Sequence, residues 1–134
     1  MRSSLKSYRK VSLESEIAVA SPHRIIQMMF EGALQRIAQS KYAIQQKKQA
    51  QKGENIGKAI SIIAGLSGSL DMDAGPEISA NLDSLYDYML RRLTEANIAN
   101  DVDMLDEVSA LLRTIKEGWD AIPQDMHGLT SEAS

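Results

Sequence analysis

The stretch Asn55 to Leu70, which reads NIGKAISIIAGLSGSL, decides the fold because it presents two distinct faces when it is coiled as a helix. At about 100° per residue, one face is an apolar stripe, made of Ile56, Ala59, Ile60, Ile62, Ile63, Leu66 and Leu70 and interrupted by Ser67. The opposite face is nearly bare and carries Gly57, Ser61, Gly65 and Gly68.

Each glycine costs an isolated helix about 0.5–1 kcal/mol relative to alanine. This helix therefore depends on packing, and we expect it at the centre of the fold. Two alternatives remain open for its second face. Either other helices of the same chain cover both faces, or one face receives a segment of another protein.

The composition is that of one globular domain, with 134 residues of which 43% are hydrophobic. Aromatic residues are scarce and there are 7 methionines, so the core consists mainly of Leu, Ile, Ala and Met. The absence of cysteine excludes disulfides and thiolate metal sites and is compatible with a reducing cytoplasm, where we expect the protein.

Charge and hydropathy exclude two classes of partner. A net charge of −3 argues against nucleic acid, because phosphate binding needs a clustered basic surface. The longest uncharged run, residues 59–70, is too short to cross a bilayer, and the N-terminus lacks the apolar segment of a signal peptide. We therefore expect no membrane insertion.

Two helices are expected in the first half of the chain. Ser21-Pro22 is a strong start signal, because Ser caps an orphan amide and Pro has none to satisfy. Apolar residues then recur at three- and four-residue steps to about Gln51, and Gly53 is the expected stop. The second helix runs from about Glu54 to Asp71. Four lysines gather around this boundary and are expected to be solvated: Lys41, Lys47, Lys48 and Lys52.

Two more helices are expected in the second half. Residues 71–76 form a turn, and a long helix opens at Pro76 with an apolar seam from Ile78 to Ala96. Residues 97–103 are the next break, with Asn100 or Asp101 as N-cap, and the last helix ends at Pro123. Arg92 lies near the seam, so it either extends outward to solvent or meets a carboxylate.

Four amphipathic helices without a convincing strand predict an all-α fold, an antiparallel four-helix up-and-down bundle with an N-terminal arm or short extra helix. The expected divisions are the arm at 1–20, the bundle at 21–122 and a flexible tail at 123–134. The arm scatters apolar residues such as Leu5 and Tyr8 through a polar segment. It either docks on the bundle or is a frayed terminus.

The usual chemistries of such bundles are not supported by the residues. The Asp71 and Asp73 spacing fails as a calcium loop, since no Glu closes it, and neither histidine has the Glu three residues earlier that a di-iron site needs. A histidine phosphotransfer domain is the nearest enzyme-like alternative, but His23 sits beside Pro22 in a first turn instead of in mid-helix. We expect no enzyme, no cofactor and no metal.

An ordered set of motifs resembles a known family. The motifs are Tyr8 in a Ser-rich arm, Ser21-Pro22 followed by IIQMMFEGA at 25–33, NLDSLYDYM at 81–89 and Glu117-Gly118-Trp119. Together they resemble the flagellar secretion chaperone FliS family over nearly the whole chain, from about Leu5 to Ile122.

The resemblance implies a cytoplasmic chaperone without enzymatic activity. Such a protein binds the disordered C-terminal segment of flagellin, keeps it from polymerising and delivers it to the flagellar export gate. In the family the client wraps around the bundle, largely as helices in apolar grooves, and the arm can cover part of that surface. The expected mechanism is helix-in-groove recognition coupled to folding of the client.

Within this hypothesis we assign groove residues on two neighbouring helices: Ala59, Ile62, Gly65, Leu66, Tyr86 and Leu90. Leu5 and Tyr8 would form the displaceable N-terminal cover. Two alternatives stay open. The bundle could be a self-associating adaptor, a homodimer paired through its glycine face, or a phosphotransfer protein that uses His23.

Overall fold

A computed structural model describes residues 20–70 and 75–123 and shows four long α-helices. They are α2 (Pro22–Gln45), α3 (Gln49–Gly68), α4 (Pro76–Ala99) and α5 (Val102–Asp120). Within the described ranges there is no strand. The expected all-α class is confirmed. The arm with Leu5 and Tyr8, and residues 124–134 of the expected tail, lie outside the described residues.

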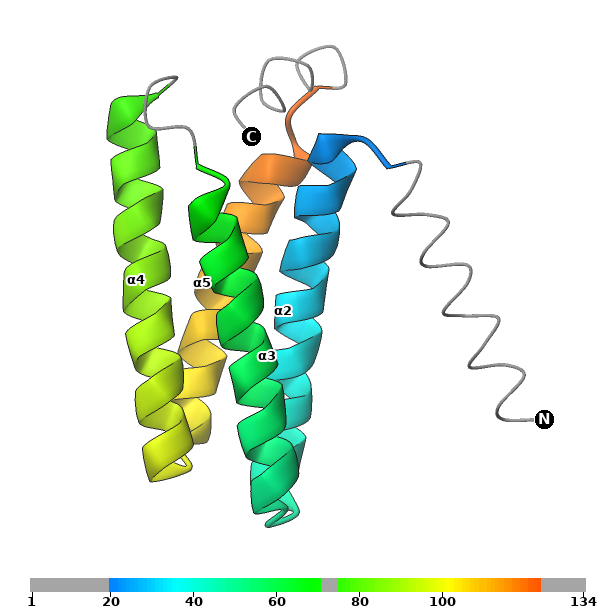
Figure 1. Ribbon diagram of the computed structural model, residues 1–134, viewed down its shortest axis with the longest axis vertical. Helices are drawn as coiled ribbons and strands as arrows, with labels where there is room; N and C mark the ends of the chain where they lie inside the picture. Colours follow the sequence, from blue (N-terminus) through cyan, green and yellow to red (C-terminus); the bar gives the residue numbers. More distant parts are fainter. Residues whose placement is uncertain (1–19, 71–74, 124–134) are drawn as a thin grey trace, which may run out of the picture.

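The helices form an antiparallel ring in which each packs against two neighbours (Figure 1). Helix α3 packs against α2 and α4, and α5 packs against the other sides of the same two helices. The α2–α3 and α4–α5 turns lie at one end of the bundle, and the start of α2 lies at the other (Figure 1). This is the up-and-down arrangement that the sequence predicts.

The core is one apolar cluster to which every helix contributes. Its members are Phe30, Ala33 and Ile37 of α2, Ile56, Ala59, Ile63 and Leu66 of α3, Tyr86, Met89, Leu93 and Ala96 of α4, and Leu105, Val108 and Leu112 of α5. Their three- and four-residue spacing puts them on one face of each helix. The apolar stripe of α3 is therefore a core face.

The expected helix starts at Ser21-Pro22 and Asp101 are confirmed. The Ser21 hydroxyl accepts a hydrogen bond from the Arg24 amide at 3.1 Å. The Asp101 carboxylate accepts from the amides of Asp103 and Met104 at the start of α5. Each side chain satisfies amides that have no partner inside the helix.

The expected boundary between the first two helices is wrong. Helix α2 ends at Gln45 and α3 begins at Gln49. Gly53 therefore lies inside α3 and does not terminate a helix. The chain turns at Lys47, whose φ of 57° is left-handed. The Lys48 amide donates to the Ala43 carbonyl at 2.8 Å and the Lys47 amide to the Ile44 carbonyl at 3.1 Å. This pair of bonds is a Schellman motif, which usually has glycine where Lys47 stands.

Candidate functional site

The seam between α2 and α3 is closed by side chains that lie over glycines of the opposite helix. The Cδ1 of Ile62 is 3.5 Å from the position that a Cβ on Gly32 would occupy. Reciprocally, the Met29 Cε is 2.9 Å from the Cβ position of Gly65. Ile62 and Met29 are both partly exposed, so an apolar strip remains open to solvent along this seam.

The seam between α3 and α4 has polar contacts at its ends and apolar side chains between them. At one end the Lys52 Nζ donates to the Asn97 carbonyl at 2.8 Å, and at the other the Ser67 hydroxyl donates to Asp83 at 2.8 Å. The antiparallel register set by these two contacts puts Ile60 level with Leu90. Both are partly exposed.

The structure divides the six predicted groove residues into three groups. Ala59, Leu66 and Tyr86 belong to the core, with exposed fractions of 0%, 1% and 3%. Ile62 and Gly65 lie on the α2 side of α3, in the seam with Met29. Leu90 follows Asp83 by two helical turns and so lies in the seam on the α4 side. The set is therefore distributed over two seams that flank α3.

The small-residue face of α3 is contacted by a described helix only at Gly65, which Met29 of α2 covers in part. Gly57, Ser61, Ala64, Gly65 and Gly68 are exposed. Among the described residues, no heavy atom of another helix lies within 4 Å of a Cβ added at Gly57 or Gly68. The other described helices therefore leave most of this face exposed, and a further segment can contact it.

Helix α5 is joined to both neighbours by polar contacts. The Glu107 carboxylate accepts from the Arg92 Nε at 2.7 Å and from the Tyr88 hydroxyl at 2.8 Å, which joins α4 to α5. Arg92 thus meets a carboxylate, one of the two predicted outcomes. The hydrogen bond from Arg92, and then that from Tyr88, lowers the pKa of Glu107 because both favour its charged form.

The α2–α5 seam has a similar set of contacts. The Lys41 ammonium pairs with Asp106 at 3.0 Å, and the Gln27 amide donates to Asp120 at 2.7 Å. The Trp119 indole N–H donates to the His23 carbonyl at 3.0 Å, and the two rings stack with centroids 4.7 Å apart. The α2–α3 seam also has such a contact, because the Arg36 guanidinium donates to the Asn55 Oδ1 at 3.0 Å, so polar contacts occur in all four seams.

His23 has the wrong environment for phosphotransfer. Its side chain is 2% exposed and lies flat against Trp119, with an interplanar angle of 10°. A phosphoacceptor histidine has to reach the phosphodonor of another protein, and this ring is covered.

Two further kinds of site are absent from the described residues. In residues 20–70 and 75–123, no group of three or more His, Cys, Asp or Glu side chains is placed to hold a metal ion. None of the helices found there combines the length and apolar character needed to span a membrane.

Sequence reasoning missed two candidate groove residues. The helical pattern places Ile60 in the core stripe and Met29 in the motif of the first helix, and it indicates a groove role for neither. The exposure of Ile60 follows from its place at the edge of the stripe. For Met29 the signal was Gly65, since a helical glycine leaves space that a long flexible side chain of a neighbouring helix can fill.

Comparison with known proteins bears on the whole chain. The family model described as Flagellar protein FliS matches residues 4–126. The chain is 48% identical to the Flagellar secretion chaperone FliS of Vibrio cholerae over 131 residues, which is 98% of this chain and 96% of the relative.

Two further relatives agree in name and extent. The Flagellar secretion chaperone FliSB of Pseudomonas aeruginosa is 50% identical over 118 residues, covering 88% of this chain and 94% of the relative. The Flagellar secretion chaperone FliS of Salmonella typhimurium is 45% identical over 121 residues, covering 90% of each.

Proposed function

The chain belongs to the family of Flagellar protein FliS, and from this membership we propose that it is a cytoplasmic export chaperone for flagellin. It binds the disordered C-terminal segment of newly made flagellin and prevents that segment from polymerising too early. It then hands the client to the flagellar export gate. It acts by binding and has no catalytic role.

One observation carries this proposal, namely the partly exposed apolar side chains on both sides of α3. Ile62 and Met29 lie in the α2–α3 seam, and Ile60 and Leu90 lie in the α3–α4 seam. The outer face of α3 between these seams has small side chains, so a helix of the client can approach its backbone closely. An amphipathic client helix needs such a surface of apolar strips at helical spacing.

Of the six groove residues predicted from the sequence, Ile62, Gly65 and Leu90 are the ones a client can contact directly in this arrangement. Ala59, Leu66 and Tyr86 support the seams from inside the core. Leu5 and Tyr8 remain the proposed cover, which leaves the bundle when a client binds.

Folding of the client on the bundle sets the strength of the complex. Coupled folding and binding typically buries about 1,000–3,000 Å² and loses several kcal/mol in ordering the client. The net affinity is therefore moderate for the buried area, which suits a client that must be released.

Calorimetric titration with the C-terminal peptide of the cognate flagellin tests the proposal. Ile62→Asp and Leu90→Asp should each raise Kd at least about tenfold, since burying one aliphatic side chain contributes about 1.5–3 kcal/mol. Ile98→Asp is the matched control, because Ile98 also lies on α4 but is 81% exposed. Circular dichroism checks that each variant is folded. Leu66→Asp is unsuitable, because a charge at a side chain that is 1% exposed would unfold the bundle.

If both seam variants bind the peptide as well as the parent does, this groove assignment is wrong. If only one of them loses affinity, the client uses one side of α3. Deletion of residues 1–10 should preserve or strengthen binding, and a complete loss would make the arm part of the site itself.

The exposed small-residue face also supports a second candidate, self-association through α3. Two copies of this face could pack closely because Gly57, Gly65 and Gly68 keep the helix surface flat. Analytical ultracentrifugation distinguishes the two functions. A stable homodimer that ignores the flagellin peptide would favour the adaptor over the chaperone.

A further inference from the structure

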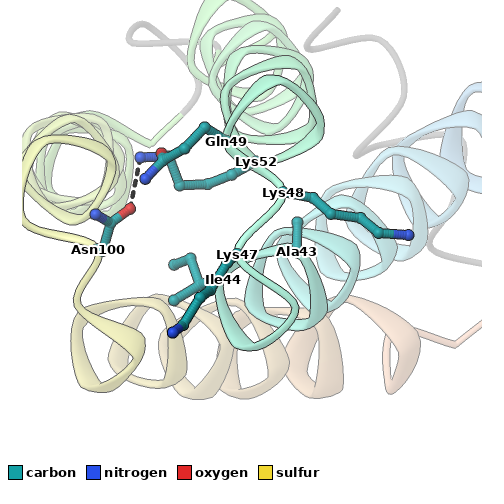
Figure 2. A pocket seen from close by; sticks show the side chains of 7 residues that line it. All are labelled: Ala43, Ile44, Lys47, Lys48, Gln49, Lys52 and Asn100. Atoms are coloured by element: carbon teal, nitrogen blue, oxygen red, sulfur yellow. Dashed lines mark hydrogen bonds between the residues drawn. The ribbon is translucent and has the colours of Figure 1, made fainter.

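A basic pocket lies at the turn end of the bundle, away from the start of α2. Its volume is about 300 Å³, and it is bordered by the α2–α3 turn and the C-terminal end of α4. Figure 2 shows its lining residues: Ala43, Ile44, Lys47, Lys48, Gln49, Lys52 and Asn100. Three of the seven are lysines, although the whole chain has a net charge of −3.

Lys52 places a buried positive charge in the wall of this pocket. Its side chain is 7% exposed, so the expectation of a solvated lysine at this position is wrong. The ammonium donates to the Asn97 carbonyl at 2.8 Å and to the Asn100 Oδ1 at 2.6 Å. Both acceptors are neutral, and an ammonium has three hydrogens to donate. The Lys52 charge is thus stabilised by two neutral acceptors, and the third N–H of its ammonium can donate to a further acceptor.

The other two lysines extend this charge to the rim. Lys47 and Lys48 are exposed, and their side chains point in different directions from the turn (Figure 2). Among residues 20–70 and 75–123, no carboxylate forms an ion pair with either of them or with Lys52. Three ammonium groups without a carboxylate partner therefore lie around the turn: Lys52 and Lys47 are on the side of the pocket, and Lys48 points away from it (Figure 2).

The backbone contributes one positive helix end, the start of α3, beside the C-terminal carbonyl ends of α2 and α4. The N-cap of α3 is Lys48, which makes no side-chain cap hydrogen bond, so the first amides of this 20-residue helix face the pocket end without a side-chain acceptor. A helix N-terminus favours negative charge. The nearby Asp101 carboxylate is held at the start of α5, where it accepts from the amides of Asp103 and Met104, and it forms no ion pair with the three lysines.

We propose that this pocket docks an acidic peptide segment of a partner protein. One carboxylate of the segment enters the cavity beside Lys52, and neighbouring carboxylates pair with Lys47 and Lys48. The spread of the ammonium groups favours a chain of carboxylates over a single phosphate, which requires donors that converge on one point. The apolar floor of Ala43 and Ile44 accommodates the aliphatic part of an acidic side chain.

The test uses the full-length protein and a hexaglutamate peptide as the probe. At low ionic strength the peptide should shift the NMR signals of the Asn100 side-chain amide and of the backbone amides of residues 49–52. The double variant K47E/K48E should raise the Kd of the peptide at least about tenfold. Both side chains are exposed, so the reversal leaves the core intact.

The matched control is K58E/R113E, which changes the net charge by the same amount at exposed positions on α3 and α5. It should bind hexaglutamate as the parent protein does. An equal loss in both double variants would overturn the proposal, because the attraction would then come from net charge alone. Signal shifts confined to other regions, or no binding at all, would overturn it as well.

A third arm separates a peptide from a small oxyanion. Inorganic phosphate, added at constant ionic strength, should displace hexaglutamate no better than chloride does. Specific displacement by phosphate would overturn the peptide proposal and make the pocket a phosphate site.

Discussion

The Met29 terminal methyl lies 2.9 Å from the place where a Cβ on Gly65 would stand, so the absence of a side chain at Gly65 is what lets α2 and α3 interlock there. The same seam has Ile62 opposite Gly32. In both pairs a flexible or branched apolar side chain fills the space above a glycine.

The contact predicts different outcomes for alanine at two glycines of α3. Gly57→Ala should stabilise the protein by about 0.5–1 kcal/mol, because alanine is the better helix former and no other described helix comes within 4 Å of the new methyl. Gly65→Ala should stabilise it less, since Met29 must move aside. Urea unfolding measures both free energies. Equal gains would mean that Met29 does not pack on Gly65 in solution.

Trp119 is expected to contribute through its indole N–H as well as its ring. Trp119→Phe keeps an aromatic ring beside His23 but removes the hydrogen bond to the His23 carbonyl. The expected loss is about 1–2 kcal/mol of unfolding free energy, because a partly buried carbonyl is left without that donor. Urea titration followed by circular dichroism measures it, with Tyr42→Phe as the exposed aromatic control. A change of similar size in both variants would contradict the role of this bond.

Glu107 is expected to make the free energy of unfolding decrease as the pH is lowered. Its pKa is lowered from 4.5 in the folded protein by the hydrogen bonds from Arg92 and Tyr88. The stabilisation is therefore present above pH 4.5 and is lost as the pH falls through the lower folded pKa. Glu107→Gln should make the urea midpoint fall less steeply as the pH is lowered. The control is Glu117→Gln, at an exposed position of α5. It should leave the pH dependence of the urea midpoint as it is in the parent protein.

Tyr86 is expected to act at the alkaline end. Burial raises its pKa from 10.0 to about 12, because desolvation disfavours the phenolate. Its contribution is complete below pH 10 and is lost as the pH rises toward about 12, since only the unfolded chain ionises in that interval. Tyr86→Phe should reduce this loss in urea midpoints measured across the interval. If Tyr86→Phe loses stability with rising pH as steeply as the parent protein does, the phenol is hydrated in the folded protein.

The fold could be predicted because apolar spacing decides which face of each helix is buried. Ser21-Pro22 and Asp101 also mark helix starts with residue types whose capping chemistry is local. The turn at Lys47 could not be predicted in this way. A left-handed residue is expected to be Gly or Asn, and here the backbone bonds of the Schellman motif hold a lysine in that conformation.

The candidate groove was less predictable, because helical spacing says which residues share a face but not which neighbour each edge meets. The spacing groups Ile62 and Leu90 as groove residues, yet the structure places them in seams on opposite sides of α3. Their separation depends on the ring order of the helices, which the sequence pattern leaves open. Lys52 shows the same limit, since its burial depends on the C-terminal end of α4 being next to it.

Trp119 is the single tryptophan of the chain. Its indole lies in the α2–α5 seam and donates a hydrogen bond to α2. In the ring of helices this seam is the edge opposite the α3–α4 seam. Intrinsic fluorescence therefore reports on the joint between the first and last described helices. A ligand that occupies only the α3–α4 side leaves the emission unchanged, and a spectral shift on binding would reveal that the far edge of the bundle has moved too.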